Sequence, residues 1–322
     1  MRVCSLAASA KINLHLEILG NRPDGYHELA MVMQSIGLAD EIEIRSLSTD
    51  TIRVHCSHPD VPTDDRNLAY RAAALIVEEF PSIAQYGGVE ITIQKHIPVA
   101  AGLAGGSTNA AAVLVGLNLL WKLGLTQTDL QALGAKLGSD VPFCITGGTM
   151  LATGRGEQVS PLPDVSQLYV VLAKYRHLAV STAWAYKTYR QQFGHTYPTP
   201  ESAHRQPHTS AQSGPIVSAL AKFAQNNAAS DTLQLGQLLY NDLEKVVLPA
   251  HPLVQHLRDE LYRQPTLGAM MSGSGPTVFA LTQSLIQAQQ VQAALKVALP
   301  DPDLDSWIAP FTNTSIRVIR HD

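Results

Sequence analysis

A stretch rich in glycine and alanine, PVAAGLAGGSTNAA at residues 98–111, most constrains how this chain can fold. It follows the alternating segment VEITIQKHI and precedes apolar residues at helical spacing, which predicts a turn between a strand and a helix. The first N–H groups of a helix lack intrahelical partners and lie at the positive end of its dipole. Small residues let the backbone approach an anion closely, so this turn is a candidate phosphate site.

The stretch matches neither of two common phosphate loops. No Lys precedes Ser107 or Thr108, which excludes a Walker A motif, and Ala104 stands where the dinucleotide fingerprint needs its middle glycine. A tight turn that only packs helix against strand is the alternative interpretation. A second turn, SGSGPT at residues 272–277, suits a triphosphate bound near two backbone walls, although a simple hairpin is the favoured interpretation of this turn taken by itself.

Periodicity predicts a chain of mixed strands and helices. Strands are predicted at residues 11–19, 40–47, 50–57, 89–93 and 167–174, after the turn at 272–277, and once more near the end of the chain. Helices are predicted at residues 67–80, after the glycine-rich turn, and at 181–193, 235–248, 251–264 and 285–299. One more helix is expected to begin at Thr128, in a capping box with Gln131, and to end at Gly138. Asp140 is a candidate cap of the next helix.

The length of 322 residues suggests two domains. We expect the first over residues 1–160, with the glycine-rich turn, and the second over 161–322. The polar stretch at about 194–214, rich in Pro, Ser, Thr and His, is expected to be an insertion in the second domain and receives no role.

Composition narrows the class of protein. Hydrophobic residues make up 45% of the chain, and the net charge is 23 − 27 = −4 with no basic stripe, which disfavours nucleic-acid partners. The three cysteines show no CxxC spacing, so neither a disulfide framework nor a zinc site is expected. The most apolar run, residues 110–125, contains Asn118 and Lys122 and is too short for a bilayer. With no leader segment recognisable, we expect a cytoplasmic protein without a membrane partner.

Two pairs of side chains are candidates for chemistry and recognition. Lys11 and Asp140 could supply a cation and a base near bound phosphates, although each is more often a surface charge or a helix cap. Tyr26 and His27 follow a Pro-Asp-Gly turn. They are candidates for stacking on a nucleobase, with ordinary packing as the alternative.

Three segments, in this order and at these positions, resemble the GHMP kinases. They are AKINLHLEILGNRPDGYHEL near the start, PVAAGLAGGSTNAAAVL in the middle and MSGSGPTVFAL near the end. Within that superfamily, NRPDGYHEL together with LGSDVPF resembles the branch that acts on a cytidine diphosphate-linked methylerythritol. The resemblance spans about residues 9–281.

The resemblance implies a two-domain α+β fold, with an N-terminal domain like ribosomal protein S5 domain 2 and a ferredoxin-like C-terminal domain. It implies transfer of a phosphoryl group from ATP, with Mg²⁺, to the 2-hydroxyl of that small-molecule substrate, in the non-mevalonate (MEP) route to isoprenoid precursors. The alternatives are another GHMP kinase, acting on mevalonate, homoserine or a sugar, and a non-catalytic nucleotide-binding protein on the same fold.

The resemblance also implies roles for individual residues. Asp140 corresponds to the catalytic base and Lys11 to its charged partner, with Ser107 a possible metal contact. The implied substrate contacts are Asn13, Tyr26, His27, Thr182, Tyr186, Gly273 and Ser274, of which Tyr26, His27 and Tyr186 would hold the cytosine. The implied ATP contacts are Pro98, Val99, Ala100, Ala101, Gly102, Leu103, Ala104, Gly105, Gly106, Ser107 and Thr108.

The phosphate turn departs from the family pattern GLGGGSSNAA at two positions. Ala104 replaces a glycine, and its methyl group leads us to expect φ below zero there. Thr108 replaces a serine and keeps the hydroxyl.

Overall fold

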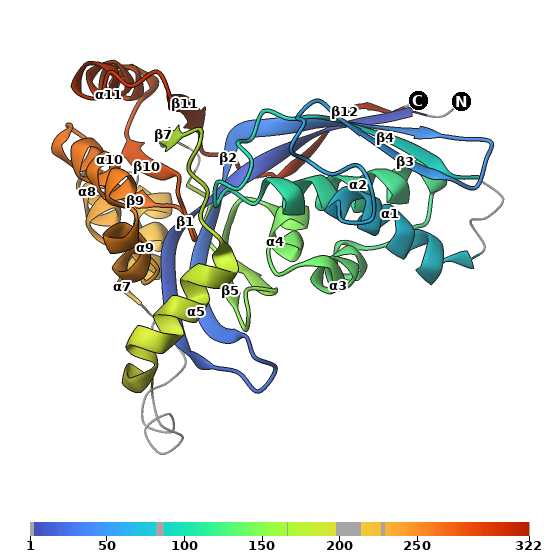
Figure 1. Cartoon of the computed structure of the whole chain (residues 1–322), viewed down its shortest axis with the longest axis horizontal. Coiled ribbons are helices and arrows are strands. Elements are labelled where there is room, and N and C mark those ends of the chain that lie inside the picture. Colours follow the sequence, from blue (N-terminus) through green and yellow to red (C-terminus); the bar gives the residue numbers. More distant parts are fainter. Residues whose placement is uncertain (1–2, 82–86, 166, 198–213, 227–228, 322) are drawn as a thin grey trace.

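Two β-sheets organise the computed structural model, which describes residues 3–81, 87–165, 167–197, 214–226 and 229–321. Within these residues one sheet has eight strands and the other has four. Figure 1 shows the first sheet and its helices on one side of the molecule and the second sheet with its helices on the other. The long hairpin of β1 and β2 runs between the two parts and ends beside α5.

The first sheet carries the N-terminal half of the chain. Its central order is β12-β1-β2-β4-β3, with β5 and β8 on β2 and β1, and β6 on β5. The bounds are β1 Val3–Asn21, β2 His27–Ser46, β3 Ile52–Cys56, β4 Val89–Gln94, β5 Thr149–Thr153, β6 Gln158–Pro161, β8 Tyr240–Asn241 and β12 Ile316–His321. Four helices lie on one face of this sheet (Figure 1): α1 Leu68–Glu79, α2 Gly105–Trp121, α3 Gln127–Leu137 and α4 Val141–Thr146.

The second sheet has the order β11-β7-β10-β9. Its strands are β7 Tyr169–Tyr175, β9 Gly268–Met271, β10 Val278–Thr282 and β11 Leu304–Pro310. The helices of this half are α5 Thr182–Phe193, α7 Pro215–Asn226, α8 Ala229–Gln237, α9 Glu244–Ala250, α10 Pro252–Arg263 and α11 Leu285–Ala298, with a 3₁₀ turn, η2, at Gly194–Thr196. Most of the expected insertion, residues 198–213, lies outside the described residues.

The buried side chains of β1 pack in different core clusters along the strand. Its pairing with β2 shifts register between Ser9 and Ala10 and again between Asn13 and His15. Before and after these shifts, residues such as Leu6 and Leu16 pack in the core cluster that includes α2, whereas Ile12 packs in a second cluster with Leu172 and Phe279. The first shift skips two residues of β2, Gly37 and Leu38, and the second skips one residue of β1, Leu14. Between the shifts, side chains two residues apart lie on the same face of β1. Lys11 and Asn13 therefore share the face that borders the site described below.

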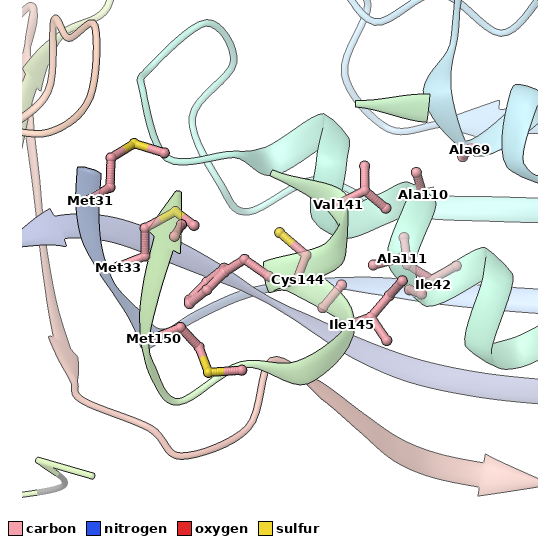
Figure 2. Packing of buried hydrophobic residues seen from close by; sticks show 14 of the residues in the cluster. Met31, Met33, Ile42, Ala69, Ala110, Ala111, Val141, Cys144, Ile145 and Met150 are labelled. Atoms are coloured by element: carbon pink, nitrogen blue, oxygen red, sulfur yellow. The ribbon is translucent and has the colours of Figure 1, made fainter. Parts of the chain in front are cut away.

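Helices α2 and α4 are fixed in the core of the first part. Most of α2 is buried, and a Cβ at its Gly116 would lie 2.5 Å from Cδ1 of Ile44 in β2, so a larger residue there would displace core side chains. Figure 2 shows Cys144 and Ile145 of α4 packed among sheet and α2 side chains. Full burial of such a side chain stabilises the fold by about 1.5–3 kcal/mol. Asp140, the residue directly before α4, is thereby held in place.

Several predicted boundaries are corrected. The cap of α3 is Thr126, in a capping box with Asp129, and not Thr128 with Gln131, whereas the end at Gly138 is confirmed. The helix predicted at 235–248 is wrong, because α8 ends at Gln237 and β8 intervenes before α9. Two strands, not one, close the chain, and the last of them, β12, joins the first sheet. The domain boundary near residue 160 stays a prediction.

Within the described ranges, no helix has both the length and the apolar character that crossing a membrane requires.

Candidate functional site

A cavity of about 930 Å³ opens between the glycine-rich turn, β1, the turn after β1, and α5. The predicted site residues that line it are Lys11, Asn13, Tyr26, His27, residues 98–107, Asp140, Thr182, Tyr186, Gly273 and Ser274. These residues come from six separate stretches of the chain, so the fold brings nearly all of the predicted site together.

Thr108 is the one predicted site residue that does not line the cavity. Its side chain is fully buried beneath the start of α2, where its hydroxyl lies 3.4 Å from that of Ser315. The hydroxyl that the sequence assigned to ATP therefore faces the core.

The glycine-rich turn adopts a left-handed backbone at alternate residues. Ala100, Gly102 and Ala104 have φ of 51°, 74° and 57°. The expectation of negative φ at Ala104 is therefore wrong, and each alanine held in this region costs about 1–2 kcal/mol. Alternating handedness turns successive N–H groups toward one concave face, which binds anions. Ala104 also begins α2 without any side-chain cap, so no side chain competes for the first amides of the helix.

The glycine-rich turn packs directly on the second turn. The Ser272 hydroxyl donates to the carbonyl oxygen of Gly102 at 3.1 Å, and a Cβ at Gly102 would lie 2.3 Å from the carbonyl oxygen of Ser272. The Ser274 hydroxyl, in turn, lies 2.8 Å from that of Thr182 at the start of α5. Backbone from both halves of the chain thus forms the walls of one cavity.

Lys11 and Asp140 meet beside these turns. The Nζ atom of Lys11 lies 3.7 Å from Oδ2 of Asp140 and donates to Oδ1 of Asn13 at 2.6 Å. The Lys11 side chain is almost fully buried, whereas that of Asp140 is 31% exposed toward the cavity. Asp140 occupies the cap position of α4, but its carboxylate makes no capping hydrogen bond. A carboxylate free of a capping role, next to a buried ammonium, can accept a proton from a bound hydroxyl.

The aromatic turn, Tyr26–His27, lines the same cavity. Tyr26 is 53% exposed, and the guanidinium of Arg155 lies 5.3 Å from the centre of its ring. His27 is buried, and its ring centre lies 5.2 Å from that of Tyr186. Burial, and to a smaller extent the charge of Arg190, lowers the pKa of His27 to about 4. The imidazole is therefore neutral near pH 7 and offers one donor and one acceptor to a ligand.

Sequence reasoning missed several residues that line or support the cavity. Arg155 stands between two glycines in a turn, and Arg190 of α5 donates to the carbonyl oxygen of Gly25 at 2.6 Å, next to Tyr26. Asp40 is fully buried under the glycine-rich turn and accepts hydrogen bonds from Lys95 and Asn109. An aspartate within a strand is an available signal for Asp40, because that residue is depleted in strands.

Two family models match the chain. One, described as the GHMP kinases N terminal domain, matches residues 67–148, and the other, described as GHMP kinases C terminal, matches residues 216–301. The chain belongs to the GHMP kinases. The α+β fold of this family, expected from the three motifs, is confirmed.

Individual GHMP kinases are similar over the full length of this chain. The 4-diphosphocytidyl-2-C-methyl-D-erythritol kinase of Nostoc punctiforme is 61% identical, with 99% of each chain covered. The enzyme of the same name from Trichodesmium erythraeum is 59% identical, again with 99% of each chain covered. The predicted resemblance to this branch of the GHMP kinases is confirmed.

Solved structures of GHMP kinases share the fold. The crystal structure of a 4-(cytidine 5′-diphospho)-2C-methyl-D-erythritol kinase matches with a TM-score of 0.70 at 30% identity, covering 95% of this chain and 98% of that one. A homoserine kinase from Cytophaga hutchinsonii matches with a TM-score of 0.74 at 20% identity, covering 98% and 97%. At that identity, the second likeness shows the fold alone.

Proposed function

We propose that this GHMP kinase transfers the γ-phosphoryl group of ATP to the 2-hydroxyl of 4-diphosphocytidyl-2-C-methyl-D-erythritol. The observation that carries the proposal is one cavity that holds an anion-binding turn, a Lys–Asp pair and an aromatic turn. Relatives up to 61% identical carry the name of that activity. Mevalonate, homoserine and simple sugars have no nucleobase to contact Tyr26 and His27.

The geometry supports a direct transfer. The ATP phosphates would accept hydrogen bonds from the backbone of residues 98–107, whose left-handed positions orient their N–H groups. The substrate oxygen would bond to the γ-phosphorus as the bond to the β-phosphate oxygen breaks, and the hydroxyl proton would pass to Asp140. Lys11, 3.7 Å from that carboxylate, would balance negative charge in the transition state.

The residues present also fit Mg²⁺ carried by ATP. Among the described residues no cluster of three His, Cys, Asp or Glu side chains forms a metal site. Mg²⁺ instead commonly takes one or two carboxylates together with phosphate oxygens and water. The Ser107 hydroxyl lines the cavity and would contact the ion together with phosphate oxygens and water, which leaves Asp140 free to accept the proton. The ion would neutralise charge on the phosphates when bound. We also propose the cytoplasm as the compartment, since ATP is supplied there.

The deciding experiment is a turnover assay with the purified protein. We expect ATP-dependent phosphorylation of the diphosphocytidyl alcohol, followed as ADP release and as the phosphorylated product by mass spectrometry. Mevalonate, homoserine and galactose serve as competing acceptors. Faster turnover of one of these would assign another GHMP activity, and binding of cytidine nucleotides without any turnover would favour a non-catalytic binding protein.

Loss of the Tyr26 ring should weaken binding of the acceptor and leave ATP unaffected. Base–aromatic stacking contributes about 1–3 kcal/mol, so Tyr26→Ala should raise the acceptor KM by about 5- to 150-fold. The matched control is Tyr262→Ala, which removes another exposed tyrosine, 66% exposed on α10 and outside the cavity. Steady-state kinetics with each substrate varied would measure both constants. Equal acceptor KM values for the two variants would contradict a role of Tyr26 in recognition.

A further inference from the structure

The segment at residues 240–244, YNDLE, makes hydrogen bonds to the second turn, residues 272–277, and to the strand before it. The side chain of Asn241 is buried, and its amide nitrogen donates to the carbonyl oxygens of Met271 at 2.9 Å and Gly273 at 2.8 Å. Its amide oxygen accepts from the N–H of Leu243 at 2.9 Å. Both hydrogens of one amide are thus committed to the backbone on either side of Ser272.

The other side of Gly273 faces Lys11 and Asn13. A Cβ at Gly273 would lie 3.3 Å from Oδ1 of Asn13 and 3.6 Å from Nζ of Lys11. Gly273 is therefore in close contact with the residues that hold the buried ammonium. A shift of the turn at Gly273 would change the space around Lys11 directly.

The residues next to Asn241 bond to β1 and to the second turn. Asp242 accepts from the backbone N–H of Ile18 at 2.7 Å, and β8 runs parallel to β1 beside His15 and Leu16. Glu244 accepts from the N–H of Met271 at 2.8 Å. Residues 240–244 thus connect the strand that carries Lys11 to the turn that carries Gly273.

We propose that Asn241 is a positioning residue for phosphoryl transfer, which sets the distance between the Gly273 turn and Lys11 through this segment. The inference rests on the proposed function. Asn241 does not line the cavity, but it bonds to Gly273, which does. Its loss should therefore lower kcat by more than it weakens the binding of either substrate.

The chemistry of the amide makes this position specific. Aspartate has the same shape but no N–H, so in Asn241→Asp a carboxylate oxygen would face the carbonyl oxygens of Met271 and Gly273. Both hydrogen bonds would be replaced by repulsion between oxygen atoms, and the turn at Gly273 would move away from residue 241. Asn241→Ala removes the same two donors without adding a charge, and serves as the second variant if the first fails to fold.

The matched control is Asn118→Asp. Asn118 of α2 also uses its amide to bridge backbone groups, donating to the carbonyl oxygen of Leu125 and accepting from its N–H, each at 3.0 Å. This bridge lies at the far end of α2 from the glycine-rich turn and outside the cavity. The control therefore reports the effect of losing a comparable amide bridge on stability alone.

The test compares kcat, both KM values, and the dissociation constants of an unreactive ATP analogue and of the acceptor, below the lowest melting temperature. We expect Asn241→Asp and Asn241→Ala to lower kcat by about 10²-fold, since a displacement of about 1 Å can have that effect. Both dissociation constants should rise by less than about tenfold, well below the fall in kcat, and Asn118→Asp should keep the wild-type kcat.

Three outcomes would overturn the inference: an unchanged kcat in the Asn241 variants, a loss that appears only in KM, or an equal loss in Asn118→Asp. Each of them leaves the proposed function intact, because wild-type turnover is measured in the same experiment. Failure of the wild type to phosphorylate the acceptor would instead reject the proposed function, on which this inference depends.

Discussion

The Asp140→Asn variant is expected to lower kcat by about 10²- to 10⁴-fold, the range typical of a lost general base. The amide keeps the shape of the carboxylate but cannot accept the proton of the substrate hydroxyl. The change also removes the negative partner of Lys11, 3.7 Å away. Steady-state kinetics would measure kcat, and calorimetry with an ATP analogue would show whether nucleotide binding persists.

A suitable control is Asp129→Asn. Asp129 is exposed in the capping box of α3 and does not line the cavity, so its loss should reduce stability by about 1 kcal/mol or less and leave kcat unchanged. Nearly normal turnover by Asp140→Asn would mean that the proton leaves by another route. Asp140 would then be only the cap position of α4.

The assignment of Asp140 could be predicted from the sequence, but the geometry that exposes it could not. LGSDVPF indicated a helix start, and the family resemblance supplied the role. In the structure, the buried residues of α4, among them Val141 and Cys144, anchor the helix while Asp140 leaves its cap unmade. Local patterns identify a possible cap, but tertiary packing decides whether the side chain makes the cap or faces a cavity.

Strand β1 shows a second limit of sequence reasoning. Alternation correctly put Lys11 and Asn13 on one face, opposite Ile12. Which of the two faces borders the cavity depends on the register shifts after Ser9 and after Asn13, which arise from pairing with β2. A shift of this kind has no signature in the composition of the strand, because either register would satisfy the same alternation.

Two further failures have tertiary causes. Ala104 was expected at negative φ because an isolated alanine prefers it, yet contacts across the two turns hold the loop in the left-handed form. Residues 235–248 have helical periodicity, yet Asn241 and Asp242 bond to distant backbone and interrupt the helix. Asn and Asp favour such breaks because their side chains compete for backbone hydrogen bonds.

The contact between the two turns gives the second large effect. Gly102→Ala should lower the free energy of unfolding by more than the strain of φ +74° alone, because the new Cβ would lie 2.3 Å from the carbonyl oxygen of Ser272. Since that atom is backbone, the turns must separate. The same movement would disturb the concave N–H groups at residues 98–107, so we expect affinity for ATP to fall at least about tenfold, equivalent to about 1.4 kcal/mol.

Gly124→Ala separates strain from contact. Gly124 has nearly the same φ, +71°, but a Cβ there would meet nothing within 4 Å, so only the backbone strain of about 1–2 kcal/mol should appear. Denaturant unfolding would compare the two losses of stability, and calorimetry would compare the two ATP affinities. Equal losses with unchanged ATP affinity would mean that the turns can separate without consequence. In that case the contact between Gly102 and Ser272 would not shape the phosphate site. Binding of the ATP phosphates would then depend only on the N–H groups at the start of α2.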